Sequence, residues 1–209
     1  MEFERRRERL VERLRDRETI EREVTAAALR AVPRHEFVPE DRRHEAYRDR
    51  PLPIGEGQTI SAPHMVAVMV DRLGLERGDR VLEVGTGCGY HAAVTAEVVG
   101  EGNVFSVEYV PELADRARET LDRLGYDVAV RTGDGHEGWP EHAPYDAAYL
   151  TCAAEQVPSA VVAQVRPGGR VLAPVGNARQ DLVRLTVRED GRTERETFGG
   201  VRFVRMQGG

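Results

Sequence analysis

The residues of this chain best suited to chemistry are three glycines, Gly85, Gly87 and Gly89, which follow a short apolar run at residues 81–84. Because glycine has no Cβ atom, a loop rich in it can turn sharply and let its backbone approach a ligand closely. An apolar strand that runs into such a loop, with a helix after it, is typical of a nucleotide-binding corner. Residues 91–99 are suited to that helix. We therefore expect a nucleotide-like ligand at this loop.

The spacing of the glycines distinguishes between classes of ligand. A dinucleotide site needs Gly-x-Gly-x-x-Gly, in which the third glycine packs helix and strand together beside a pyrophosphate. Here the third position is Tyr90, and Gly89 comes one residue early. The chain contains no lysine, so it also lacks the lysine of a phosphate-binding P-loop. A nucleoside without phosphates fits this loop better, and we expect S-adenosylmethionine.

Two carboxylates at expected strand ends support a nucleoside site. Glu108 lies 23 residues after Gly85, where a carboxylate can accept hydrogen bonds from both ribose hydroxyls. Asp134, in the turn after the next strand, is placed to accept from an adenine amino group. Each residue alone has a simpler interpretation, Glu108 as a surface carboxylate and Asp134 as a turn former. Their occurrence at the carboxyl ends of adjacent strands favours the ligand site.

The elements that must position these residues alternate between strand and helix from residue 78 onward. This pattern predicts an α/β fold with a mostly parallel, doubly wound sheet. We expect helices at 91–99 and 111–124, each stopped by a glycine. The expected strands lie at 81–84, 104–107, 128–130, 145–150 and 169–175, followed by late antiparallel strands at 182–187 and 200–204.

The N-terminal part is expected to be helical and then irregular. Apolar spacing predicts helices at 4–17, at 19–31 with Thr19 as a possible N-cap, and at 62–73. Proline and glycine punctuate residues 37–65, which we expect to form an ordered loop. The predicted division is an N-terminal segment at 1–77, a nucleoside-binding core at 78–176 and C-terminal strands at 177–209, together one compact domain.

Composition narrows the class of protein. A chain of 209 residues, 40% of them hydrophobic, can bury a core without disulfides or metals. No apolar run approaches the roughly 20 residues of a membrane span, and no secretory signal is visible. Cys88 and Cys152 lie far apart in the sequence, which favours a reducing, cytoplasmic location. The net charge of −6 argues against a nucleic-acid partner, and the N-terminal arginines alternate with acids as on a solvated helix.

Several segments together resemble the protein-L-isoaspartate O-methyltransferase family over about residues 33–176. The most distinctive is Ala46 to Met65, which includes Gly57-Gln58-Thr59-Ile60-Ser61-Ala62-Pro63-His64, and the glycine loop at 81–90 matches as well. Further matches are Pro144-Tyr145-Asp146, Thr151-Cys152-Ala153-Ala154, Val157-Pro158, Arg166 to Arg170 and Pro174-Val175-Gly176. The resemblance implies a Rossmann-like class I methyltransferase that uses S-adenosylmethionine and leaves S-adenosylhomocysteine. The implied substrates are isoaspartyl proteins and peptides, methylated on the α-carboxylate so that repair can begin through a succinimide.

The resemblance implies Ser61 as the catalytic residue, donating a hydrogen bond to the acceptor carboxylate. A carboxyl group with a pKa of about 3.9 is already ionised at pH 7, so the reaction requires no general base. Because Ser61 precedes an expected helix, a second interpretation stays open, in which it is only an N-cap. His64 is expected near the cofactor carboxylate or in the first helical turn. No metal is expected, and the implied cofactor-binding residues are Thr59, Ile60, His64, Glu83, Gly85, Thr86, Gly87, Glu108, Tyr109, Gly133, Asp134, Gly135 and Thr151.

The C-terminal segment departs from the family pattern. The family usually ends in a Phe-Val-Pro-Leu-like strand at the peptide site, whereas this chain has Phe203-Val204-Arg205-Met206. Arg205 could attract a substrate carboxylate or face solvent, and we favour solvent. Two alternatives remain: the same chemistry on one dedicated peptide, or a non-catalytic adenosylmethionine-binding protein. The intact segment 57–64 argues against the second alternative. A monomer is expected.

Overall fold

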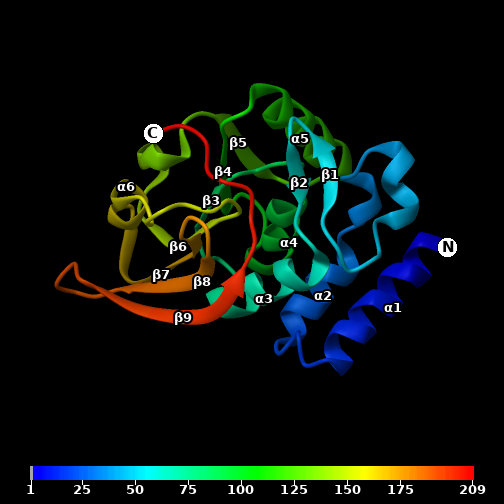
Figure 1. The fold of residues 1–209 in the computed structure, drawn as a ribbon, viewed down its shortest axis with the longest axis horizontal. Coiled ribbons are helices and arrows are strands. Elements are labelled where there is room, and N and C mark those ends of the chain that lie inside the picture. Colours follow the sequence, from blue (N-terminus) through cyan, green and yellow to red (C-terminus); the bar gives the residue numbers. More distant parts are fainter. Residues whose placement is uncertain (1) are drawn as a thin grey trace.

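The structure is a computed structural model that describes residues 2–209. Its main feature is a seven-stranded sheet (Figure 1). The strands are β3 Val81–Val84, β4 Val104–Glu108, β5 Val128–Thr132, β6 Tyr145–Leu150, β7 Val165–Val175, β8 Gln180–Val187 and β9 Thr193–Val201. They stand in the order β5-β4-β3-β6-β7-β8-β9; the first five run parallel, and β8 and β9 are antiparallel. The predicted α/β class with antiparallel strands at its C-terminal end is confirmed.

The register of the central strands brings the candidate residues to one edge of the sheet. Val84, the last residue of β3, pairs with Val107 of β4 and with Leu150 of β6. Parallel strands that end in register present the residues after them at a common carboxyl edge, where ligands bind in open α/β sheets. The residues gathered at this edge are Gly85, Glu108 and Thr151.

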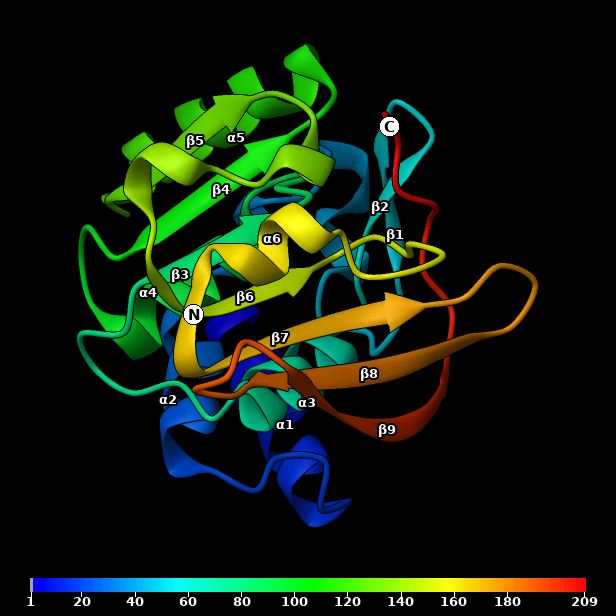
Figure 2. The ribbon, with the colours of Figure 1, turned by 90° about the vertical axis from the view of Figure 1, so that its left-hand side faces the viewer.

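Helices cover both faces of the sheet. They are α1 Glu2–Asp16, α2 Glu23–Ala31, α3 Pro63–Leu73, α4 Tyr90–Val99, α5 Pro111–Leu124 and α6 Ser159–Ala163. Successive side chains of a strand point to opposite faces. Val81 of β3 packs in a core with α1 to α5, whereas Leu82 and Val84 pack in a second core with α6 (Figure 2). No helix within residues 2–209 combines the length and the apolar character needed to cross a bilayer.

Two predicted element boundaries were wrong. Thr19 does not cap α2, which begins at Glu23 after an extended N-cap, Arg22, with φ −104°. The chain turns instead at Glu18, whose φ of 55° lies in the left-handed region. The last strand spans β9 Thr193–Val201 rather than 200–204, because its exposed, charged residues pair along β8 as an edge strand. A charged, solvent-facing edge has little apolar alternation to indicate a strand.

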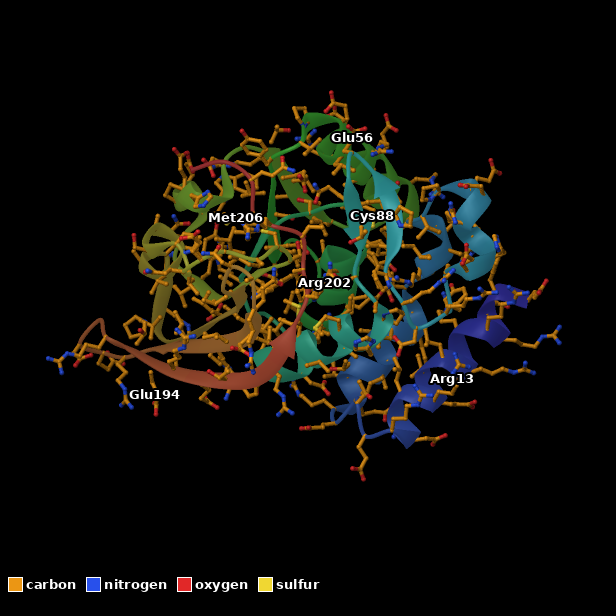
Figure 3. All side chains as sticks on the ribbon, viewed as in Figure 1. Arg13, Glu56, Cys88, Glu194, Arg202 and Met206 are labelled. Carbon is orange, nitrogen blue, oxygen red and sulfur yellow. The ribbon has the colours of Figure 1, made fainter. Side chains whose placement is uncertain are left out.

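The segment at 37–65, expected to be a loop, contains a β-hairpin made of β1 Leu52–Gly55 and β2 Gln58–Ile60, as well as the short 3₁₀ helix η2 Glu40–Glu45. Another 3₁₀ helix, η1 Arg34–Glu36, lies just before it. The hairpin forms because Leu52, Ile54 and Ile60 bury their side chains on one side. Its turn needs three residues with positive φ, namely Gly55, Glu56 and Gly57. Glu56 marks the free end of the hairpin in Figure 3.

The start of α3 is capped from a distance. Its N-cap residue is Ala62, which offers no side-chain hydrogen bond, so the interpretation of Ser61 as the N-cap was wrong. The carboxylate of Asp49 takes that role: its Oδ1 accepts the backbone N–H of His64 at 2.9 Å and lies 2.9 Å from Nδ1 of the same residue. An anionic acceptor at the first helical turn also interacts favourably with the helix dipole.

We expect Asp49→Ala to lower the free energy of unfolding by about 1 kcal/mol, because α3 loses its only side-chain acceptor at this turn within the described chain. Asp49→Asn keeps an acceptor oxygen and is the matched control. Ser61→Ala should change the same quantity by less than about 0.5 kcal/mol. Urea unfolding of the three variants measures this, and a Ser61→Ala loss equal to that of Asp49→Ala would contradict the assignment of the cap.

Candidate active site

A cleft lies along the carboxyl edge of the sheet, at the end of β3 and β4. The glycine loop forms its floor, and residues 204–207 of the C-terminal tail form its outer wall. The tail is held there because the N–H of Ala153 donates to the carbonyl of Val204 at 2.8 Å and the N–H of Met206 donates to the carbonyl of Ala153 at 2.9 Å. Of the predicted cofactor-binding residues, those that line the cleft are Thr59, Gly85, Gly87, Glu108, Tyr109, Gly135 and Thr151.

Glu108 fixes the glycine loop. Its carboxylate accepts the N–H of Gly87 at 2.8 Å and the N–H of Val110 at 3.0 Å, and the residue is only 6% exposed. An acidic residue at the end of this strand binds the ribose of a nucleotide ligand in α/β folds of this kind. The cleft is therefore suited to a ribose, Tyr90 at the third glycine position disfavours a dinucleotide, and a cationic sulfonium ligand is compatible with the carboxylate.

Gly85 has no room for a side chain. Its φ is 98°, and a Cβ atom there would lie 2.3 Å from Oγ1 of Thr151. The Thr151 hydroxyl donates to the carbonyl of Gly85, so β3 and β6 are joined just beyond their ends. A Cβ at Gly87, by contrast, would meet only Cδ1 of Ile54, at 3.4 Å. Gly85 is required for packing between strands, whereas Gly87 leaves open space on the ligand side.

Glu83 lies behind the loop, on the α4 face of β3, and is fully buried. The hydroxyl of Tyr149 donates to Oε1 at 2.9 Å, the hydroxyl of Ser106 lies 2.5 Å from Oε2, and Oγ1 of Thr86 lies 2.6 Å from Oγ of Ser106. Burial raises the pKa of Glu83 to about 8, against the opposing effect of its hydrogen bonds. Glu83 is thus linked to Thr86 through the hydroxyl of Ser106. It lines none of the pockets described within residues 2–209.

The predicted adenine-binding carboxylate is occupied on both oxygens. Oδ1 of Asp134 accepts the N–H of His136 at 2.9 Å and lies 2.8 Å from its Nδ1, while Oδ2 accepts the N–H of Gly209 at 2.9 Å. Burial acts to raise the pKa of Asp134, but the hydrogen bonds from His136 and Gly209 outweigh it and the pKa is lowered. Asp134 also caps a short 3₁₀ helix, η3 Gly135–Glu137. Gly133 precedes this turn, and Gly135 alone of the three lines the cleft.

A second, larger groove adjoins the cleft. Thr59 and Thr151 line both spaces, so the two meet at this pair of hydroxyls. Ser61 lines the groove and a small internal pocket with Ile60 and Thr86, and its hydroxyl has no hydrogen-bond partner among the residues that the structure describes. His64 lines the groove rather than the cleft, with its ring against Asp49. The predicted residues thus fall into two adjoining spaces that share one junction.

Sequence reasoning missed several residues of these spaces. Arg205 is exposed, as expected, but lines both the cleft and the groove. His91, at the start of α4, is 6% exposed, and both ring nitrogens lack hydrogen-bond partners within residues 2–209. Burial lowers the pKa of His91 to about 3, so the ring is neutral. It borders the same internal pocket as Ser61. The described residues contain no cluster of three or more His, Cys, Asp or Glu that could hold a metal.

The family can now be assigned. A sequence model described as protein-L-isoaspartate(D-aspartate) O-methyltransferase matches residues 5–209, which includes the cleft, the groove and the tail. The chain belongs to this family. The match extends the resemblance found for residues 33–176 to residues 5–209.

Individual relatives agree with this assignment. The chain is 54% identical to protein-L-isoaspartate O-methyltransferase 2 of Archaeoglobus fulgidus over 210 residues, covering 100% of this chain and 95% of the relative. It is 52% identical to the Methanopyrus kandleri protein of the same family, covering 99% and 93%. A solved protein-L-isoaspartate O-methyltransferase superposes with a TM-score of 0.87 at 32% identity, covering 97% of this chain and 66% of the other. A Plasmodium falciparum structure, titled as a putative member in complex with S-adenosyl-L-homocysteine, gives a TM-score of 0.86 at 25% identity, covering 96% and 98%.

The buried carboxyl of Glu83 makes stability depend on pH. Because its folded pKa of about 8 lies above the ordinary value of 4.5, the folded protein holds the proton more tightly than the unfolded chain does. This contribution to stability is complete below pH 4.5 and is lost as the pH rises to about 8. We therefore expect the wild type to lose stability relative to Glu83→Gln as the pH rises from 5 to 8. The difference in free energy of unfolding, wild type minus variant, should decrease by up to about 1.4 kcal/mol per pH unit.

Denaturant unfolding of both proteins at each pH measures this difference, and Gln is the matched neutral residue. A difference that stays flat from pH 5 to 8 would show that Glu83 is ionised in the folded protein.

Proposed function

We propose that this protein transfers the methyl group of S-adenosylmethionine to the α-carboxylate of L-isoaspartyl residues in damaged proteins and peptides. The observation that carries the proposal is the junction at Thr59 and Thr151, where a cleft suited to an adenosine opens into a groove with a free serine hydroxyl. The names of the relatives and the S-adenosylhomocysteine in a related structure support the same reaction.

The residues present fit the cofactor. Glu108 would accept the ribose hydroxyls, since it stands at the end of β4 with its carboxylate already directed at the glycine loop. Gly85 and Gly87 would let the ligand lie against the backbone, and Gly135 with Met206 would border the adenine end. When bound, the cofactor supplies an electrophilic methyl group on a positively charged sulfur.

The protein then has to orient the acceptor and exclude water. An acceptor carboxylate is ionised at pH 7, so an oxygen of it forms the new bond to the methyl carbon as the carbon–sulfur bond breaks, and no proton moves. The Ser61 hydroxyl would donate a hydrogen bond to the second carboxylate oxygen and fix the direction of attack. Tail residues 204–207 border the cleft on its outer side and would limit the entry of water.

The product of this step is a neutral methyl ester. Attack by the following backbone nitrogen on the ester carbonyl would expel methanol and form a succinimide, whose hydrolysis returns part of the material as normal aspartate. We propose that the protein acts as a monomer in the cytoplasm on isoaspartyl proteins and peptides, without a nucleic-acid partner.

One observation favours a second candidate, the same chemistry on a single dedicated peptide. Arg205 lines the groove and the cleft at the position where the family pattern has proline. A changed residue at this junction is compatible with a substrate set narrower than that of a general repair enzyme.

The direct test uses a pair of peptides that differ only in one isoaspartyl or aspartyl linkage. Methyl esters should form on the isoaspartyl peptide and stay at the background level on the aspartyl peptide. A panel of unrelated isoaspartyl sequences separates the two candidates, because a repair enzyme methylates many and a dedicated enzyme only one. Binding of the cofactor without methylation of any peptide would contradict both.

Ser61→Ala should lower kcat on an isoaspartyl peptide by roughly 10-fold, the effect of one orienting hydrogen bond. The Kd for S-adenosylhomocysteine should stay within about 2-fold, because Ser61 does not line the adenosine cleft. Ser159→Ala, at an exposed position on α6, is the matched control. An unchanged kcat for Ser61→Ala would remove this residue from the reaction.

A further inference from the structure

The groove beside Ser61 is positively charged, although the whole chain has a net charge of −6. Three arginines line it, Arg179, Arg202 and Arg205, and its described lining contains no aspartate or glutamate. Arg179 has only a long contact, 3.9 Å from its Nε to Oδ1 of Asp181. The charge of the groove is therefore local and is not a consequence of the overall composition.

Two of these arginines have no internal partner. Arg202 and Arg205 are exposed, and neither makes a side-chain hydrogen bond or an ion pair with any residue in the described range 2–209. Arg188, directly after β8, is paired instead: its Nη2 lies 2.7 Å from Oε2 of Glu194. Figure 3 shows Arg202 near the middle of the molecule and Glu194 toward the far end of β9. Arg202 and Arg205 thus have free guanidinium groups inside the groove, whereas that of Arg188 is paired outside it.

The position of these arginines indicates which substrate carboxylates they can bind. Arg205 lines both the groove and the cleft. Arg202, three residues earlier in the same extended segment, lines the groove but not the cleft. Three extended residues span about 10 Å, the length of a few residues of a bound peptide. A guanidinium paired with the acceptor carboxylate would withdraw electron density from the attacking oxygen. Arg202 and Arg205 are therefore better suited to bind carboxylates of the substrate residues next to the isoaspartyl residue.

We propose that the groove selects isoaspartyl sites flanked by aspartate or glutamate. Arg202 and Arg205 bind the flanking carboxylates, and the acidic surface outside the groove disfavours acidic segments in other orientations. The inference rests on the proposed function and adds the substrate class to it. It is distinct from that function, because an enzyme that methylates all isoaspartyl peptides equally would satisfy the function and not the inference.

The test compares isoaspartyl peptides with blocked termini that carry glutamate, glutamine or lysine at positions next to the isoaspartyl residue. For the wild type, kcat/KM should be about 3- to 10-fold higher with glutamate than with the isosteric glutamine, and lowest with lysine. The preference should disappear as the salt concentration rises from 0.05 to 0.5 M, since exposed charge pairs are screened within about 10 Å at 0.1 M salt.

Variants assign the preference to residues. Arg202→Gln and the double variant Arg202→Gln/Arg205→Gln should bring the glutamate-to-glutamine ratio toward 1, mainly through KM. Arg188→Gln, which removes a paired arginine outside the groove, should keep the wild-type ratio. Calorimetry with S-adenosylhomocysteine checks that Arg202→Gln leaves cofactor binding intact, because Arg202 does not line the cleft.

Three outcomes would overturn the inference while leaving the methyltransferase activity in place. The wild type could show the same kcat/KM for glutamate and glutamine peptides. The groove variants could lower kcat/KM equally for all peptides, which would place the arginines on the acceptor carboxylate. Arg188→Gln could lose the preference to the same degree, which would make it an effect of overall charge. A failure to methylate any isoaspartyl peptide would instead reject the proposed function.

Discussion

The contact on which the rest of the site depends is the carboxylate of Glu108 against the backbone N–H groups of Gly87 and Val110. It holds the glycine loop in place from the end of the neighbouring strand, and it places a carboxylate where α/β nucleotide-binding folds bind a ribose. The parallel register of β3, β4 and β6 sets this geometry, because it ends all three strands at one edge. Glu108 thus marks the place of a ribose, while Tyr90 at the position of the third glycine favours S-adenosylmethionine over a dinucleotide.

The cofactor cleft and the neighbouring groove are formed by different parts of the chain. The sheet edge is rigid, with Gly85 packed against Thr151 so closely that a side chain cannot be added. The groove is assembled mostly from segments outside the parallel strands, namely the end of the β1–β2 hairpin, the start of α3, residues 177–180 at the β7–β8 turn and the C-terminal tail. Asp49, in the segment before β1, is joined to the start of α3 through His64. Substrate preference can therefore change in these segments, as at Arg205, while the cofactor cleft stays the same.

Features set by neighbouring residues could be predicted from the sequence, whereas features set by distant ones could not. The strand at 145–150 and the helix ends at Gly74, Gly100 and Gly125 follow from local apolar pattern and glycine conformation. Ser61 was misjudged as a possible cap because the true acceptor lies 15 residues away in the chain. The hairpin was hidden by its proline and glycines, and the sequence alone does not show that Glu83 turns toward α4 and away from the cleft. The roles of the individual site residues stay predictions.

The most direct measurement is a crystal structure with S-adenosylhomocysteine and an isoaspartyl peptide bound together. We expect the ribose hydroxyls on the carboxylate of Glu108, the thioether sulfur at the junction between Thr59 and Thr151, and the α-carboxylate of the isoaspartyl residue within hydrogen-bonding distance of the Ser61 hydroxyl. A nucleoside bound away from Glu108, or a sulfur atom that faces away from the groove, would contradict the account.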